Sequence, residues 1–354
     1  MTNNFLTDRF SYGIIMGYYG PIWSNEALND YADFCVQYGH KYFIYAPKKD
    51  LLLRDNWATP FTDQQIQQLK HLRDNFENRG VKFGIGLSPF GLNSLDDAGK
   101  AKLKIKIDQI NSINPTILGV FFDDIDKSSI YPGLAVGQVK IAEYIATIST
   151  AKSFISVPTY YSNDQILQRA LGPTPPTYLS DFSKIDQKFS IFWTGEHIIS
   201  SGYAEDELNA ISNIFKRKVI LWDNYPVNDT VYLIDYLRIF ALTARPAKLS
   251  SWVSGIAFNP MLQAYMSMIP MATAKSLFSS PEYNPRQAYL QVLNELCGAK
   301  LAQAIDQNLP YFLWRGIKRT EPVNIERMLD LFELFTEQRE QKFTSEIIQL
   351  LKHP

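Results

Sequence analysis

Short apolar segments alternate with amphipathic segments along most of this 354-residue chain, and this alternation limits the folds open to it. Eight apolar segments, rich in Val, Ile, Phe and Tyr, have the character of buried strands. They are residues 13–17, 42–45, 82–87, 117–122, 153–157, 189–193, 219–222 and 253–258. Helical periodicity follows in residues 25–38, 62–79, 96–113, 136–149, 204–215, 232–244 and 263–277. The remaining interval, 162–188, is rich in proline and predicts a loop with a short helix.

Eight strands, each followed by a further segment, match the count of a (β/α)8 barrel. A doubly wound sheet gives the same alternation, but it usually has fewer strands, and no G-x-G-x-x-G phosphate turn follows the first strand here. From about Tyr283 the pattern changes to helical segments without strands, at 285–297, 299–308 and 323–351. We therefore predict an α/β fold, with a TIM-type barrel over residues 1–280 and a C-terminal helical region over 281–354. Packing of this region on its own barrel is favoured over a homodimer through the same helices.

Composition limits the class of protein further. With 46% hydrophobic and 20% charged residues, the chain suits a globular protein with a large core. A formal net charge of -1 gives no reason to expect nucleic acid or an anionic membrane as a partner. Cys35 and Cys297 lie far apart in apolar helical patterns, which favours reduced thiols over a disulfide or a zinc site. No signal peptide and no membrane-spanning run is visible, so the predicted location is the cytoplasm.

Two adjacent aspartates, Asp123 and Asp124, come directly after the fourth predicted strand. Neighbouring carboxylates cannot both ionise cheaply in a partly dry site, which favours a proton on one of them. A neutral acid beside a charged carboxylate is what glycoside hydrolysis requires. Taken alone, the pair fits a solvated acidic turn before the next helix equally well.

Polar and aromatic residues also follow the other predicted strands. Catalytic residues of barrel enzymes lie at the carboxyl ends of the strands, so these clusters belong to one edge of the predicted barrel. Structural need alone does not account for seven clusters on one edge, and we predict the active site there. The clusters are residues 17–23, 45–50, 123–124, 158–161, 193–195, 222–229 and 259–260.

The segments 17–23, 45–48, 123–126, 193–195 and 222–229 resemble motifs of family 84 of the glycoside hydrolases. That family comprises β-N-acetylglucosaminidases, among them protein O-GlcNAcases and some so-called hyaluronidases. The likeness extends from about Tyr12 to Asn259, with the motifs in the same order, and the helical tail has only a loose counterpart. The resemblance implies a retaining exo-β-N-acetylglucosaminidase that needs no cofactor, no metal and no enzyme nucleophile. The 2-acetamido oxygen of the substrate instead attacks the anomeric carbon and gives an oxazoline.

The resemblance also implies roles for the matching residues. Asp123 would accept a hydrogen bond from the acetamido N–H, and Asp124 would protonate the leaving oxygen and then deprotonate water. The other matching residues are implied to contact the sugar. Asp229, Asn224, Lys48 and Asn259 would bind its hydroxyls, Gly17 would offer a carbonyl, Tyr161 would line the acetamido pocket, and Trp222 with Tyr19 would form the slot for the acetyl methyl.

Some positions depart from the family pattern or allow other interpretations. Lys49 and Tyr160 stand where the family usually has acidic residues. This leaves open which substrate groups the protein prefers at subsites beyond the bound sugar. Two roles are open for Asp126, orienting the catalytic loop or capping the following segment, and the structural role is favoured. One alternative is a magnesium cluster at residues 123–126, although no phosphate loop or basic clamp accompanies it. Another is a sugar-binding barrel without catalysis. The leaving group, from a glycoprotein or another glycan, stays open.

Overall fold

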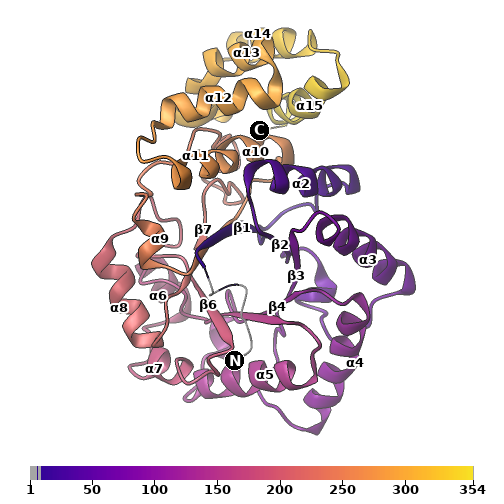
Figure 1. Ribbon diagram of the computed structural model, residues 1–354, viewed down its shortest axis with the longest axis vertical. Helices are drawn as coiled ribbons and strands as arrows, with labels where there is room; N and C mark the ends of the chain where they lie inside the picture. The colour runs from indigo at the N-terminus through magenta and orange to yellow at the C-terminus, as the bar shows by residue number, and fades with distance from the viewer. Residues whose placement is uncertain (1–5, 7–8, 354) are drawn as a thin grey trace.

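Eight parallel strands close into a barrel in the computed structural model, which describes Leu6 and residues 9–353 (Figure 1). Each strand pairs with the next, and β8 pairs with β1 to close the ring, with Tyr12 opposite Ile256. The predicted (β/α)8 barrel is confirmed, and each predicted strand lies within two residues of an observed one. The strands are β1 (Ser11–Met16), β2 (Tyr42–Tyr45), β3 (Lys82–Leu87), β4 (Ile117–Phe121), β5 (Ser153–Val157), β6 (Phe189–Trp193), β7 (Ile220–Asp223) and β8 (Gly255–Phe258).

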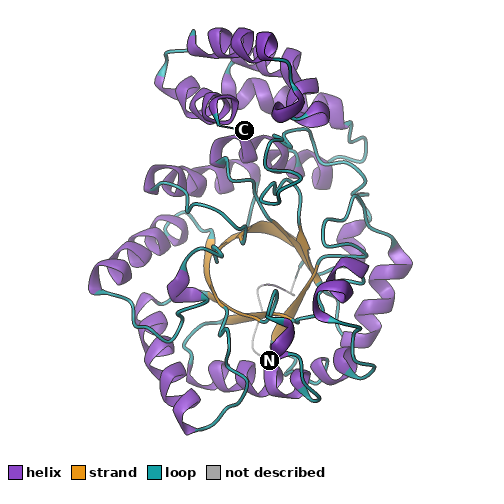
Figure 2. Cartoon of the chain, turned by 180° about the vertical axis from the view of Figure 1, so that it is seen from behind, coloured by secondary structure: helices purple, strands orange, loops and turns teal. Residues whose placement is uncertain are grey.

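Helices enclose the ring of strands on its outside (Figure 2). Side chains at Ser24, Thr62 and Asp96 cap the first turns of three of them by accepting backbone N–H bonds. The helices around the barrel are α2 (Asn25–Tyr38), α3 (Asp63–Glu77), α4 (Asp97–Ile113), α5 (Leu134–Ile148), α6 (Gln165–Leu171), α7 (Tyr178–Phe182), α8 (Glu205–Phe215), α9 (Leu249–Trp252), α10 (Ala264–Ala272) and α11 (Ala274–Ser279). Two short 3-10 turns, η1 (Leu51–Leu53) and η2 (Lys127–Ser129), follow β2 and β4.

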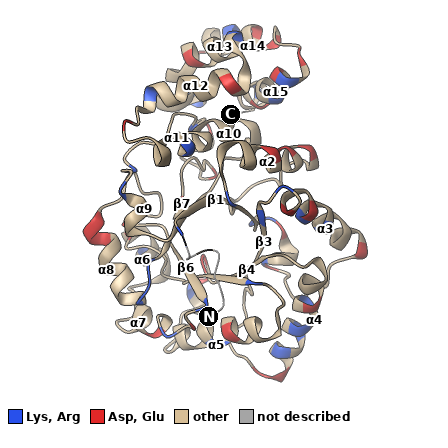
Figure 3. Cartoon of the chain, viewed as in Figure 1, with Lys and Arg blue, Asp and Glu red and all other residues tan. Residues whose placement is uncertain are grey.

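The surface of this barrel carries charges of both signs. Basic and acidic positions are interspersed around the ring of helices, as Figure 3 shows. None of the helices in the described part of the chain is both long and apolar enough to cross a membrane.

The helix predicted for residues 232–244 is wrong. Leu237, Ile239 and Ala241 are buried and alternate with half-buried neighbours, which is the period of an extended segment. The backbone bonds with other parts of the chain, since the Leu237 N–H donates to the Phe312 carbonyl at 3.0 Å. Because neighbouring segments satisfy this backbone, the bonding pattern of a helix is not required.

The C-terminal helices form a layer against one side of the barrel, above α10 and α11 in Figure 1. The single helix predicted for residues 323–351 is wrong, because the chain turns at 334–337 and its two halves pack on each other. This turn allows both Phe332 and Ile347 to be fully buried. The elements of this layer are α12 (Pro285–Cys297), α13 (Ala299–Pro310), the π-helical turn η3 (Tyr311–Arg315), η4 (Ile317–Arg319), α14 (Pro322–Glu333) and α15 (Gln338–Lys352).

Polar contacts fix α15 to the barrel of its own chain. The Glu346 carboxylate accepts the N–H groups of Tyr265 at 3.1 Å and Met266 at 2.9 Å, at the start of α10. Lys342 pairs with Glu26 at 3.1 Å and Asp30 at 2.5 Å on α2. The predicted domain boundary at residue 280 falls in the loop between α11 and α12, and it stays a prediction, as does pairing of two chains through these helices.

We expect Glu346 to make stability depend on pH. Burial raises its pKa from 4.5 to about 8, although the N–H donors at the start of α10 act in the opposite direction. Such a carboxyl binds more protons folded than unfolded, so its contribution to stability is complete below the unfolded pKa and is lost as the pH rises through the folded one. The Tm should fall between about pH 5 and pH 8, and Glu346→Gln should flatten that fall. Glu326→Gln, at an exposed position on α14, is the control. An equal pH slope for wild type and Glu346→Gln would contradict this assignment.

Candidate active site

One pocket of about 210 Å³ lies at the carboxyl ends of the strands. Its lining comes from the last residues of β5, β6 and β7 and from the loops after β1, β2 and β4 to β8, which is the edge that the sequence predicts. All the residues singled out from the sequence contribute to it: Gly17, Tyr19, Lys48, Asp123, Asp124, Tyr161, Trp222, Asn224, Asp229 and Asn259. The structure therefore brings these residues together, and their roles toward a ligand stay predictions.

Asp123 lies at the end of β4 and is only 5% exposed. Lys48, from the loop after β2, forms a buried ion pair with its Oδ2. Burial alone would raise the pKa of Asp123, but the charges of Lys48 and Arg54 and the Lys48 hydrogen bond hold that pKa below its usual value. The other oxygen, Oδ1, is also buried and has no hydrogen-bond partner among the described residues. Asp123 is thus a charged carboxylate with one unused acceptor.

Asp124 is half-buried, and both of its carboxylate oxygens accept hydrogen bonds from tyrosines. Tyr161 donates to Oδ1 at 2.7 Å and Tyr19 donates to Oδ2 at 2.9 Å. Burial and the nearby charge of Asp124 raise the pKa of both hydroxyls, so both keep their protons and act as donors. The resemblance implies that Tyr161 lines the acetamido pocket and that Tyr19 helps to form the slot for the acetyl methyl. In the structure both hydroxyls bind Asp124, and both implied roles stay predictions.

The Asp124 backbone is left-handed, with a φ of 51°. Such a conformation is uncommon for a residue with a side chain and costs of order 1–3 kcal/mol unless neighbouring groups support it. Arg54 gives that support, since its Nη2 donates to the Asp124 carbonyl at 2.8 Å and its Nη1 to the Asp123 carbonyl at 3.4 Å. Sequence reasoning missed Arg54, because an arginine followed by Asp55 in a loop has the pattern of an ordinary surface pair.

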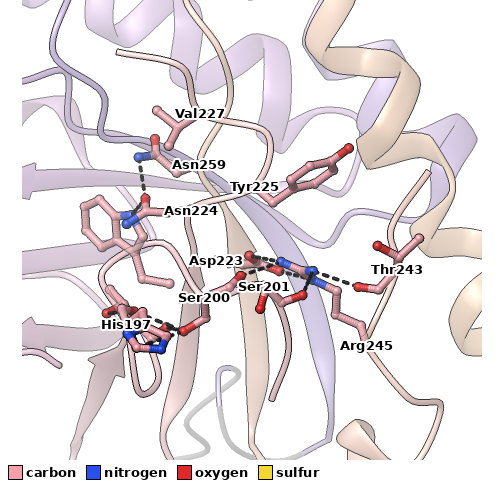
Figure 4. Close-up of polar contacts among 12 residues, drawn as sticks. His197, Ser200, Ser201, Asp223, Asn224, Tyr225, Val227, Thr243, Arg245 and Asn259 are labelled. Atoms are coloured by element: carbon pink, nitrogen blue, oxygen red, sulfur yellow. Dashed lines mark hydrogen bonds and ion pairs between the residues drawn. The ribbon is translucent and has the colours of Figure 1, made fainter. Parts of the chain in front are cut away.

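Two asparagines and a tryptophan form another wall of the pocket. Asn224 Oδ1 accepts from Trp222 Nε1 at 3.0 Å and from Asn259 Nδ2 at 2.9 Å (Figure 4). Asn259 Oδ1 in turn accepts the Gly17 N–H at 3.1 Å. A Cβ on Gly17 would lie 2.3 Å from the Trp222 ring, so this position requires glycine. Each amide keeps an unused N–H that can reach a ligand hydroxyl.

A buried ion pair between Asp223 and Arg245 lies behind this wall (Figure 4). Arg245 donates to both Asp223 oxygens, at 2.7 and 2.9 Å, and to the carbonyls of Ser200, Ser201 and Thr243. The pair therefore ties the loop after β6 to the end of β7. Sequence reasoning missed Arg245 as well, because nothing near it in the chain indicates a carboxylate partner.

Asp229 lines the pocket, whereas Tyr160 and Lys49 lie outside it. Burial raises the pKa of Asp229, and the Tyr19 N–H, which donates to its Oδ2 at 2.7 Å, opposes that shift. Asp126 stands at the N-cap position of η2, but its side chain makes no capping hydrogen bond there. Tyr160 is buried against Tyr178, Lys49 is exposed, and neither lines the pocket. No group of His, Cys, Asp and Glu placed to hold a metal ion occurs among the described residues.

Together these features define a (β/α)8-barrel protein with a carboxylate pair at the end of β4, in a pocket with polar and aromatic walls. The model of the β-N-acetylglucosaminidase family, NAGidase, matches residues 12–309, and the chain belongs to this family. The family predicted from the motifs is thereby confirmed.

Relatives and solved structures agree with this assignment. The chain is 25% identical over 284 residues to protein O-GlcNAcase of Rattus norvegicus, and 24% identical over 283 residues to that of Mus musculus. Each alignment covers 77% of this chain but only 30% of the relative, so the chain spans less than a third of their length. A solved structure of a variant O-GlcNAc hydrolase from Thermobaculum terrenum is 26% identical, with a TM-score of 0.76, and the match covers 97% of this chain and 74% of that one.

We expect Lys48→Met to destabilise the protein because Asp123 would stay buried without its partner. Breaking a buried ion pair costs about 3–5 kcal/mol, and we expect about 3 kcal/mol because the pocket admits water. Urea unfolding at neutral pH measures the loss, and Lys49→Met, at the exposed neighbouring position, is the matched control. The double variant Lys48→Met/Asp123→Asn should recover most of the stability. A double variant as unstable as Lys48→Met would show that Lys48 stabilises the fold through other contacts.

Proposed function

We propose that this protein is a retaining exo-β-N-acetylglucosaminidase that uses the acetamido group of its substrate as the nucleophile. The observation that carries this proposal is the state of Asp123. Its Oδ2 is paired with Lys48, while its buried Oδ1 has no partner among the described residues. A desolvated, charged acceptor of this kind is expected to find a donor when a ligand binds, and the N–H of a 2-acetamido group is such a donor.

The proposed reaction begins at that contact. Once Asp123 accepts the acetamido N–H, the amide is held with its carbonyl oxygen toward the anomeric carbon. The carbonyl oxygen attacks and an oxazoline forms, and the charge of Asp123 stabilises the positive charge that develops on the amide. Lys48 keeps Asp123 ionised throughout and retains further N–H donors, one of which can reach a sugar hydroxyl.

Asp124 is proposed to move the proton in both steps. It gives a proton to the leaving oxygen while the oxazoline forms, and it then removes a proton from the water that opens the oxazoline. A group with this role must meet solvent and substrate, and Asp124 is half-buried whereas Asp123 is 5% exposed. The Tyr19 and Tyr161 hydroxyls hold its carboxyl group in one orientation.

The rest of the pocket suits an amino sugar. Asn224, Asn259 and Asp229 offer donors and acceptors to ring hydroxyls, and the Gly17 carbonyl lies on the same wall. The Trp222 ring packs at the edges of Phe121 and Phe192, with centroids 5.8 and 5.3 Å apart, and so gives a rigid apolar surface for the acetyl methyl.

The substrate, the location and the assembly are parts of the same proposal. The similarity to proteins named O-GlcNAcase supports a glycoprotein that carries N-acetylglucosamine on Ser or Thr as the substrate.

A cytoplasmic location fits the buried, free thiols of Cys35 and Cys297. Pairing of two chains through the C-terminal helices is supported by the exposed side chains of Val323 and Leu334.

A panel of aryl β-glycosides tests the activity. We expect turnover of the N-acetylglucosaminide with the β-anomer as first product, which NMR shows directly. The glucoside, which lacks the acetamido nucleophile, should react at least about a thousandfold more slowly, because an intramolecular nucleophile gains far more than this in effective concentration. The N-acetylgalactosaminide shows the selectivity for the 4-hydroxyl. Equal rates on the glucoside and the N-acetylglucosaminide would contradict the mechanism, and binding without turnover would make the protein a sugar-binding barrel.

A further inference from the structure

Arg54 connects two loops of the barrel at the base of the active site. It directly follows η1 in the loop after β2, and it is only 6% exposed. Its guanidinium donates to the carbonyl oxygens of Asp124 and Asp123, at 2.8 and 3.4 Å. The ladder between β4 and β5 extends no further than Phe122, whose N–H donates to Val157 at 3.0 Å. The two aspartates therefore lie beyond the sheet, and Arg54 holds their backbone where the sheet no longer does.

The conformation of Asp124 makes this contact important. Of the other left-handed residues with side chains, Asn114 and Lys216 terminate α4 and α8, where this conformation is common, and Ala244 lies in a loop. Asp124 follows a strand and has no helix to terminate. Its left-handed backbone determines where its carboxyl group lies, and the bond from Arg54 to its carbonyl holds that backbone in place.

The same guanidinium also supports a side-chain partner of Asp124. The Arg54 guanidinium lies 5.9 Å from the ring centroid of Tyr19 and 5.0 Å from that of Phe90. Tyr19 in turn donates its hydroxyl to Asp124 Oδ2 at 2.9 Å. Arg54 therefore acts on Asp124 along two routes, through the main chain and through the Tyr19 ring.

We propose that Arg54 is a positioning residue for proton transfer, which fixes Asp124 against the leaving group by holding the main chain of both aspartates. This inference rests on the proposed roles of Asp123 and Asp124. Substitution by lysine separates two properties of Arg54. Lysine keeps the positive charge but lacks the planar guanidinium that reaches two carbonyls.

The charge has an effect of its own on the aspartate pair. Groups from several loops face Asp123. They are Tyr19 after β1, Lys48 and Arg54 after β2, Asp124 after β4, and Tyr161 after β5. Asp229, after β7, faces Asp124. Lys48 and Arg54 are the positive members of this set. Removing the charge of Arg54 should make Asp123 easier to protonate, and the acidic limb of kcat/KM should move to higher pH.

Two variants and a control test the proposal. Arg54→Lys keeps the charge and Arg54→Met removes it, while Asp55→Asn removes the 3.5 Å ion pair of Arg54 without changing its bonds to the carbonyls. Aryl β-N-acetylglucosaminides with activated and with poor leaving groups are compared, because only poor leaving groups need a proton in the transition state. We expect Arg54→Lys to lose at least about tenfold more activity on poor leaving groups than on activated ones. The acidic limb of its kcat/KM profile should stay at the pH of the wild type, whereas that of Arg54→Met should move to higher pH. Asp55→Asn should behave as wild type.

A uniform fall in activity on all leaving groups in Arg54→Lys would overturn the proposal and leave Arg54 a packing role. An unshifted acidic limb in Arg54→Met would overturn the effect assigned to its charge. Melting temperatures of all variants show whether activity is lost through unfolding, and Arg54→Lys carries the test where Arg54→Met does not fold. A wild-type protein that turns over none of these glycosides would overturn the proposed function and this inference with it. Wild-type turnover with a uniform Arg54 effect would overturn this inference alone.

Discussion

The buried ion pair between Lys48 and Asp123 is the interaction on which the arrangement of the pocket depends. It keeps a carboxylate charged at a position that is 5% exposed, among rings that would otherwise favour the neutral acid. Because Lys48 occupies one oxygen of Asp123, the other is left as a desolvated acceptor without a partner among the described residues. A ligand with an N–H at that point gains a strong hydrogen bond, and the proposed chemistry begins there.

The pocket is held by contacts that a purely structural protein would not need. Asp124 adopts a left-handed backbone, and the Asp223–Arg245 pair is almost fully buried. Both features cost stability unless they are supported from several sides. The closed barrel gives this support, since the loops that bond to the two arginines all begin at the ends of paired strands. Arg245 joins the loop after β6 to β7, and Arg54 joins the loop after β2 to that after β4.

Much of the fold and the location of the site could be predicted from the sequence. Apolar strand segments, and the polar residues that follow them, can be recognised from neighbouring residues in the chain. The helix expected at residues 232–244 failed because that backbone bonds to Phe312, which is far away in the chain. Arg54 and Arg245 escaped prediction for a similar reason. Their partners include main-chain carbonyls of other loops. Every residue has such a carbonyl, so the identity of the residues does not indicate which one an arginine will bind.

The division of roles between Asp123 and Asp124 is the central claim, and the dependence of kcat/KM on leaving-group acidity tests it most directly. Asp124→Ala should lose activity on poor leaving groups and keep much of it on activated aryl groups, because only the former need its proton. Asp123→Ala should slow all leaving groups alike, because it removes support for attack by the acetamido oxygen. The same dependence on leaving-group acidity in both variants would contradict the assignment.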